Sequence, residues 1–338
     1  MNFPYEIKDA DEEVGKYVSS IFQKRKKCFL QVGPKNYFLF SKYRDEAAGY
    51  YNLELRPDDV WVVTFPRSGT TWTQELVWLV NNDLDYERAL NEKLIDRFPL
   101  LELSVLARNE IFDCLMEENK DDSTRQKDIK KLFSPGYEMA KKMNSPRHFK
   151  THLPLSLLPP KLLDSCKVIY VARNPKDVAV SYYHFNKLQR DFGEEVSFEE
   201  YWDLFQRGLL HWSPYWSHVE EAWNDRSHKN MLLLFYEDMK KDLSAVVRNV
   251  VDFFGKSITD DQMEKLMNHL DINNFRTNPS LKKLVHQDPK EGKDGTPSGF
   301  YRKGEIGGWK SEFSEELNRR ADQWIREQET KIGLHFQY

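Results

Sequence analysis

VWVVTFPRSGTTW, residues 60–72, combines an apolar run, a glycine-containing bend and the start of a helical pattern. The run at 60–65 is short and continuously apolar, which is typical of a strand buried in a parallel sheet. Gly69 can turn the chain back with a positive φ at little cost. Residues 70–82 have the pattern of a helix. The stretch therefore predicts a strand, a tight turn and a helix, in that order.

Two further apolar runs have the same character, and each is followed by a helical pattern. They are KVIYVAR (167–173), followed by a helix at 175–187, and NMLLLFYED (230–238), followed by a helix at 239–254. Repeated units of strand and helix are typical of a parallel sheet with helices on both faces. The sequence thus predicts an α/β fold with a central parallel sheet flanked by helices.

Long segments connect these strand–helix units along the chain. The segments 84–145 and 195–225 are rich in Leu, Trp and charged residues, and we expect helical insertions there. No linker divides the chain, so one domain is expected over 1–338, with an N-terminal extension at 1–40. The stretch HQDPKEGKDGTPSGFYRKGEIGG (286–308) is polar until its aromatic and basic end. A loop this long is disordered or functional, and we expect a lid that closes on an anionic ligand.

Composition narrows the class of protein. The chain has 338 residues, of which 40% are hydrophobic and 31% charged, so it can bury a core. Its 50 basic and 54 acidic residues give no global attraction to nucleic acid or to an acidic membrane. No apolar stretch approaches the ~20 residues of a membrane span, and no signal-peptide core is visible. The three cysteines match no metal or redox spacing. We expect a cytoplasmic protein without a metal site, a nucleic-acid partner or a membrane partner.

The turn after the first strand could hold a phosphate or sulfate ester. N–H groups of residues 67–71 can converge at the start of the following helix, whose dipole adds positive potential. Thr70 and Thr71 add hydroxyl donors, and Arg67 adds a planar cation suited to ester oxygens. A nucleoside-triphosphatase P-loop would need glycine at Thr64 and lysine at Thr70, so two residues of that motif are missing. A purely structural turn is the alternative.

The segment HFKTHLP (148–154) carries a second feature. Lys150 and His152 point to the same side of an extended chain, because side-chain direction repeats every two residues. This pair suits transfer of an anionic group to an alcohol. The histidine would take the acceptor proton, and the lysine would stabilise developing charge. The alternative is a solvated strand edge, on which His148 continues the alternation.

A second anion site is predicted within RNPKDVAVS, which begins at Arg173 and ends at Ser181. Asn174 suits a helix N-cap, Pro175 suits the first helical position, and Asp177 completes a pattern like a capping box. Arg173 is not explained in this way, since it stands at the carboxyl end of a strand, where ligands of α/β sheets bind. Ser181 could share an anion with Arg173 if the helix crosses the rim of the site.

Four stretches in one order together closely resemble the cytosolic sulfotransferase family, which uses 3′-phosphoadenylyl sulfate (PAPS) as sulfuryl donor. They are TFPRSGTTW (64–72), KTHLPLSLLP (150–159), RNPKDVAVSYYHF (173–185) and FYRKGEIGGWK (300–310). The similarity extends from about residue 40 to near the C-terminus, and RFPLLE (97–102) and LFYEDM (234–239) belong to it.

The resemblance implies roles for single residues. His152 matches the family's catalytic base, and Lys150 and Arg67 match groups that stabilise charge. Donor-binding residues implied by the 5′-phosphosulfate loop, the 3′-phosphate site, the adenine site and the lid are Arg67, Ser68, Gly69, Thr70, Thr71, Trp72, Arg173, Ser181, Tyr236, Arg302, Lys303 and Gly304. Leu100 and Phe185 would line the acceptor pocket. No metal is implied, and the nucleotide product would be adenosine 3′,5′-bisphosphate (PAP).

The chain also departs from the family pattern. Most members carry lysine where this chain has Arg67, which stays charged and cannot supply a proton; we expect activity to survive with an altered rate. HLDI (269–272) stands near the family's adenine-contacting Thr-Ser-Phe, so no residue is carried over there. KSEFSE (310–315) only partly matches the family's dimer motif, which leaves a monomer and a homodimer open.

The expected function is transfer of the sulfuryl group from PAPS to a hydroxyl of a small apolar phenol or alcohol. Transfer would be in line, with His152 as general base. One alternative is an enzyme like retinol dehydratase, which acts through a transient sulfate ester. The others are a P-loop nucleotide kinase and a non-catalytic nucleotide-binding protein.

Overall fold

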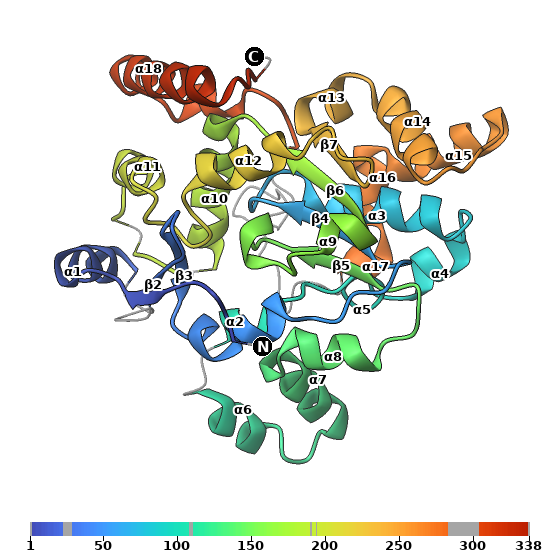
Figure 1. Ribbon diagram of the computed structural model, residues 1–338, viewed down its shortest axis with the longest axis horizontal. Coiled ribbons are helices and arrows are strands. Elements are labelled where there is room, and N and C mark those ends of the chain that lie inside the picture. Colours follow the sequence, from blue (N-terminus) through green and yellow to red (C-terminus); the bar gives the residue numbers. More distant parts are fainter. Residues whose placement is uncertain are drawn as a thin grey trace.

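A parallel sheet with the strand order β5-β4-β6-β7 forms the centre of the molecule (Figure 1). Its strands are β4 (Val60–Thr64), β5 (His148–Thr151), β6 (Lys167–Ala172) and β7 (Met231–Phe235). All three pairings are parallel, so the carboxyl ends of the strands meet at one edge of the sheet. The computed structural model describes residues 2–22, 29–107, 111–189, 191–193, 195–282 and 304–336. The predicted α/β fold with a central parallel sheet is confirmed.

Two of the three predicted units match closely. β4 leads into α3 (Thr70–Asn81), and β6 leads into α10 (Pro175–Leu188). The third unit differs from the prediction. β7 ends at Phe235, and the predicted helix at 239–254 is two helices, α13 (Tyr236–Lys241) and α14 (Leu243–Phe253). Asp242 breaks the helix, because its side chain accepts a hydrogen bond from the N–H of Ala245 and caps α14.

The predicted N-terminal extension holds a second sheet that the sequence analysis did not predict. Strands β1 (Ile7–Asp9), β2 (Phe29–Val32) and β3 (Tyr37–Phe40) pair antiparallel in chain order. Their buried side chains join the same hydrophobic cluster as one face of the central sheet. Helix α1 (Glu12–Ile21) lies within this extension, and α2 (Tyr43–Tyr51) follows it.

Helices form the other connections, as predicted for 84–145 and 195–225. In the first segment lie α4 (Tyr86–Asn91), α5 (Leu94–Arg97), the 3₁₀ helix η2 (Leu103–Leu106), α6 (Phe112–Glu118), α7 (Ser123–Phe133) and α8 (Gly136–Lys142). In the second lie α11 (Phe198–Gln206) and α12 (Tyr215–Asn224). Elsewhere the chain forms η4 (Leu155–Leu157), α9 (Leu162–Ser165), α15 (Asp260–Leu270), α16 (Ile272–Thr277), α17 (Pro279–Lys282), η5 (Gly308–Ser311) and α18 (Glu315–Ile332).

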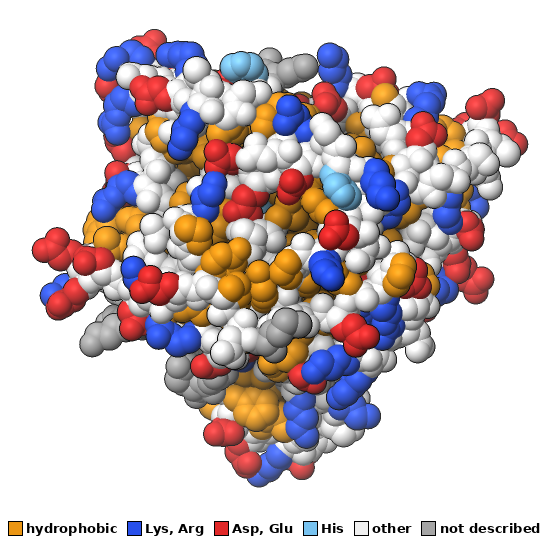
Figure 2. Space-filling view, in the orientation of Figure 1, with side chains coloured by type: hydrophobic (Ala, Val, Ile, Leu, Met, Phe, Trp, Pro, Cys, Tyr) orange, Lys and Arg blue, Asp and Glu red, His pale blue; other side chains and the backbone are white. Residues whose placement is uncertain are grey.

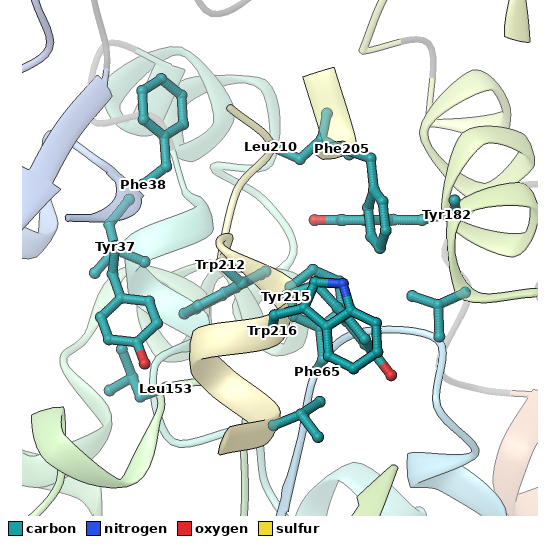
Figure 3. Close-up of a cluster of buried hydrophobic side chains, with 14 of the residues drawn as sticks. Tyr37, Phe38, Phe65, Leu153, Tyr182, Phe205, Leu210, Trp212, Tyr215 and Trp216 are labelled. Atoms are coloured by element: carbon teal, nitrogen blue, oxygen red, sulfur yellow. The ribbon is translucent and has the colours of Figure 1, made fainter. Parts of the chain in front are cut away.

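Both faces of the central sheet are buried, which is why β4, β6 and β7 are mostly apolar. In β4, Trp61 and Val63 enter one core, whereas Val60 and Val62 enter the other. The first core is rich in aromatic side chains, and Figure 3 shows part of it. Phe65, directly after β4, packs edge-on against Tyr215 with ring centroids 5.2 Å apart. The turn that follows β4 is therefore anchored in the core at its first residue.

The surface in Figure 2 carries basic and acidic side chains interspersed, so this face presents no large field of one sign. Within the described ranges, no helix is long and apolar enough to cross a membrane.

Candidate active site

The carboxyl ends of the central strands open into a cavity of about 640 Å³. Most of the site residues predicted from the sequence line it: Arg67, Gly69, Thr70, Thr71, Trp72, Leu100, Lys150, His152, Arg173, Ser181, Phe185, Tyr236 and Gly304. Ser68 does not line the cavity; it is fully buried beneath the turn. Arg302, Lys303 and most of the predicted lid at 286–308 lie outside the described residues. The structure therefore gathers residues that are distant in the sequence into one site.

The turn after β4 has an unusual backbone that favours glycine. Gly69 has φ 96° and Arg67 has φ 70°. A Cβ atom on Gly69 would lie 2.6 Å from Cδ2 of Tyr236, so a side chain does not fit there. Gly69 is also the N-cap of α3, and Thr70 and Thr71, the first two residues of this helix, line the cavity. The first N–H groups of a helix have no partner within the helix. The turn has the backbone of an anion-binding helix start.

His152 lies beside the turn with a defined tautomer. Its Nδ1 is 2.9 Å from the carbonyl oxygen of Thr64. Because a carbonyl oxygen only accepts, Nδ1 carries the proton, and Nε2 of the neutral ring keeps its lone pair. Burial, and then the charge of Lys150, hold the pKa of His152 well below its usual value. The ring is therefore neutral near pH 7 and can accept a proton at Nε2.

Lys150 lies in β5, but the outer edge of that strand is not solvated. The segment 99–101 pairs with it: the N–H of Lys150 donates to the carbonyl of Pro99, and the N–H of Leu101 donates to the carbonyl of Lys150. His148 is buried and lies 3.0 Å from Nδ2 of Asn81. The alternative of a solvated strand edge is therefore wrong. Burial lowers the pKa of Lys150 to about 8, with Glu102 raising it and Arg67 lowering it further.

Two arginines connect the turn with α10. Nη1 of Arg173 donates to the carbonyl of Arg67 over 3.0 Å, and Nε of Arg67 donates to Oγ of Ser181 over 3.0 Å. The guanidinium of Arg173 also lies 4.2 Å from the ring centroid of Tyr236. Helix α10 thus crosses the rim of the site. This position allows Ser181 and Arg173 to share one ligand, as the sequence analysis required.

Asp177 has a different role from the one predicted. Asn174 does cap α10, accepting from the N–H of Lys176, but Asp177 completes no capping box. Its carboxylate instead accepts from the N–H groups of Gly307 and Trp309, at 2.8 and 3.3 Å. The start of α10 therefore holds residues 307–309, which lie shortly after Gly304 in the chain.

Aromatic and aliphatic side chains that the sequence analysis did not identify line the rest of the cavity. They include Phe22, Phe29, Phe40, Ile95, Phe98, Leu103, Leu106, Trp212, Ile272 and Phe275. The ring of Trp212 lies 5.8 Å from that of His152. No cluster of His, Cys, Asp and Glu side chains in the described part of the chain could hold a metal ion.

The family model of the sulfotransferase domain matches residues 57–333. The chain belongs to the sulfotransferase family. It is a PAPS-dependent sulfotransferase, and this assignment removes the nucleotide-kinase alternative. Its relatives include sulfotransferase 1 family member D1 of Rattus norvegicus, 34% identical over 277 residues, which are 82% of this chain and 85% of the relative. Human sulfotransferase 1C2 is 32% identical over 286 residues, 84% of this chain and 88% of the relative.

Solved structures have the same fold. Retinol dehydratase, in a complex with retinol and PAP, has a TM-score of 0.89 and 34% identity, and the comparison covers 100% of both chains. Mouse sulfotransferase SULT7A1, complexed with PAP, has a TM-score of 0.62 and 24% identity over 87% of this chain and 92% of that chain. PAP is thus bound in structures related to this sulfotransferase.

Proposed function

We propose that this sulfotransferase transfers the sulfuryl group of PAPS to the hydroxyl group of a small apolar alcohol or phenol, with His152 as general base. One observation carries the proposal. The hydrogen bond from Nδ1 to the carbonyl of Thr64 leaves the Nε2 lone pair of a neutral imidazole in a cavity that also contains Lys150 and the start of α3. This combination provides a proton acceptor and an anion site side by side.

Features of the cavity support binding of a doubly anionic nucleotide. Nε of Arg173, a residue that lines the cavity, is buried and has no hydrogen-bond partner among the residues described. Gly69 lines the cavity without a side chain, which lets a ligand approach its backbone closely. We infer that the turn holds the 5′ end of the donor, and that Arg173 and Ser181 hold the 3′-phosphate, joined by Gly304 and the lid residues. Trp72 and Tyr236 would contact the adenine.

PAPS supplies the sulfuryl group when it is bound; the protein supplies positions, charges and a base. His152 accepts the proton of the acceptor hydroxyl at Nε2. The positive charges of Lys150 and Arg67 stabilise the negative charge that develops on oxygen during transfer. Arg67 keeps its charge throughout, so it stabilises without donating a proton.

The acceptor side of the cavity favours an apolar molecule. Leu100 and Phe185 line it together with the aromatic side chains from the N-terminal sheet. Apolar walls exclude water and bind apolar surface through the hydrophobic effect. The high TM-score over the full length of retinol dehydratase favours a second candidate function, in which an allylic alcohol is sulfated and the sulfate is then eliminated.

Incubation with PAPS labelled in its sulfuryl group tests both functions. The acceptors are phenols, sterols and retinoids, and chromatography separates sulfate esters from dehydrated hydrocarbons. The His152→Ala variant should lose about 10²–10⁴-fold in kcat, the usual contribution of a general base, while its affinity for PAP stays near that of the wild type. His148→Ala is the control, because His148 is a buried histidine of β5, the strand just before His152, and does not line the cavity. Normal turnover by His152→Ala would show that the base is another group.

A further inference from the structure

The backbone of His152 is held on both sides by buried side chains that do not line the cavity. Oε1 of Glu102 accepts from the N–H of His152 over 2.6 Å. Nε2 of His218 lies 3.0 Å from the carbonyl oxygen of His152. Glu102 and His218 are both 0% exposed, and neither lines the cavity, so neither can touch a bound substrate.

Glu102 fixes more than one residue of this segment. Its Oε2 accepts from the hydroxyl of Thr151 over 2.8 Å. The same hydroxyl oxygen accepts from the N–H of Leu153 over 3.0 Å. One carboxylate therefore holds the three consecutive residues 151–153, directly or through the threonine.

A carboxylate at this place is costly for the fold. Burial raises the pKa of Glu102 to about 7, although the N–H of His152 and the hydroxyl of Thr151 lower it. An uncharged residue of similar volume would avoid this desolvation cost. The Glu102 carboxylate is costly to bury, and its hydrogen-bond partners belong to the segment that carries the proposed base. This combination indicates a functional constraint on Glu102.

His218 connects the same segment to the central sheet. The carbonyl of His152 only accepts, so Nε2 of His218 carries the proton and its Nδ1 accepts from the hydroxyl of Tyr170 at 2.8 Å. Burial lowers the pKa of His218 to about 4, so it stays neutral in its role as donor. Tyr170 lies in β6, next to β4 in the sheet. His218 and Tyr170 therefore connect the carbonyl of His152 to a central strand of the sheet.

We propose that Glu102 and His218 are positioning residues of sulfuryl transfer, which hold the His152 backbone so that Nδ1 reaches the carbonyl of Thr64 and Nε2 faces the acceptor. This inference rests on the proposed role of His152 as base. A single hydrogen bond from Nδ1 contributes only about 0.5–1.5 kcal/mol, so it does not fix the ring alone. A displacement of the base by about 1 Å can cost about 10²-fold in rate.

Paired variants separate hydrogen bonding from packing. Glu102→Leu removes both acceptors, whereas Glu102→Gln keeps one. His218→Phe removes the donor, whereas His218→Gln can keep an N–H at the same place. We expect kcat to fall about 10–10²-fold in Glu102→Leu and His218→Phe, by the rate cost of a misplaced base, with partial recovery in the two glutamine variants. The Kd for PAP should change less than about twofold, since neither residue lines the cavity.

Matched controls come from the same fold. Glu46 is a buried carboxylate that accepts from the hydroxyls of Tyr50 and Ser104, and it does not line the cavity. His148 is a buried histidine whose pKa burial also lowers to about 4. Glu46→Gln and His148→Phe should lose stability without loss of kcat per folded molecule.

The deciding measurement does not require turnover. In protein labelled with ¹⁵N in the histidine rings, the His152 signals are assigned by their loss in His152→Ala. They should report the Nδ1–H tautomer in the wild type and in both controls, and a mixture of tautomers in Glu102→Leu and His218→Phe. An unchanged tautomer together with unchanged kcat in these two variants overturns the proposal, as does an equal loss of kcat in the controls. A wild type that transfers no sulfate would reject the proposed function, while the tautomer would still test the positioning.

Discussion

Gly69→Ala tests the proposed anion-binding role of the turn most directly, because the structure gives two separate reasons why glycine is required. The φ of 96° lies in the region that side-chain-bearing residues avoid. The added Cβ would also lie 2.6 Å from Cδ2 and 3.2 Å from Cε2 of Tyr236. Tyr236 is buried between Trp72 and Arg173, so it cannot yield without moving two proposed donor-binding residues.

The two costs can be estimated separately. A left-handed backbone at a residue other than glycine costs about 1–2 kcal/mol. Forcing extra volume into a packed site costs about 1–3 kcal/mol more. Gly255 provides the control for the first cost, since its φ is 64° and no atom lies within 4 Å of its Cβ position. Gly255→Ala should therefore lose about 1–2 kcal/mol in the free energy of unfolding, and Gly69→Ala about 2–5 kcal/mol.

Urea unfolding and calorimetric titration with PAP measure the two variants side by side. We expect Gly69→Ala to raise the Kd for PAP at least about tenfold, which corresponds to about 1.4 kcal/mol, and Gly255→Ala to leave it unchanged. Equal Kd values in the two variants would refute the argument that this turn and Tyr236 form the donor site. Equal losses of stability would refute the predicted clash.

Three further predictions follow from the same geometry. The pKa of Lys150 is lowered to about 8, so its charge is lost as pH rises through that value. We therefore expect kcat/KM for PAPS to fall above about pH 8. Lys150→Arg should abolish this fall, because arginine keeps its charge. Asp177→Asn weakens charge-assisted hydrogen bonds to residues 307–309 and should raise the Kd for PAP about 3–30-fold, measured by titration. Arg67→Lys removes the donor to Ser181 but keeps a charge, so sulfuryl transfer should persist with a changed kcat; complete loss of activity would contradict this.

The fold was predictable where burial on both faces of the sheet left a simple pattern. β4 and β6 are apolar throughout because their alternate side chains enter two cores. The end of β7 was not predictable in this way, since Tyr236 and Glu237 continue the buried character of the strand into α13. Burial alone does not distinguish the last residues of such a strand from the first turn of the next helix.

The residues of the site also fall into those that the sequence identified and those that it did not. Arg173 was identifiable because a charged residue at the carboxyl end of an apolar strand needs an explanation. Arg67 was identifiable as the cation of the turn, and Lys150 because it alternates with His152. The aromatic side chains of the N-terminal sheet, such as Phe29 and Phe40, gave no signal, because an apolar residue that lines a cavity looks like one that fills a core. Those contacts exist only after distant segments have packed together.

The charges of the site have a second effect that links donor binding to base chemistry. The charge of Lys150 lowers the pKa of His152, next to the larger effect of burial, and Arg67 acts in the same direction. The cations that would hold an anionic donor therefore also keep the imidazole unprotonated. A bound anion offsets part of this charge, which favours the protonated imidazole that forms as the acceptor loses its proton. The same two side chains thus favour a neutral base in the free enzyme and, once the donor is bound, permit that base to take up a proton.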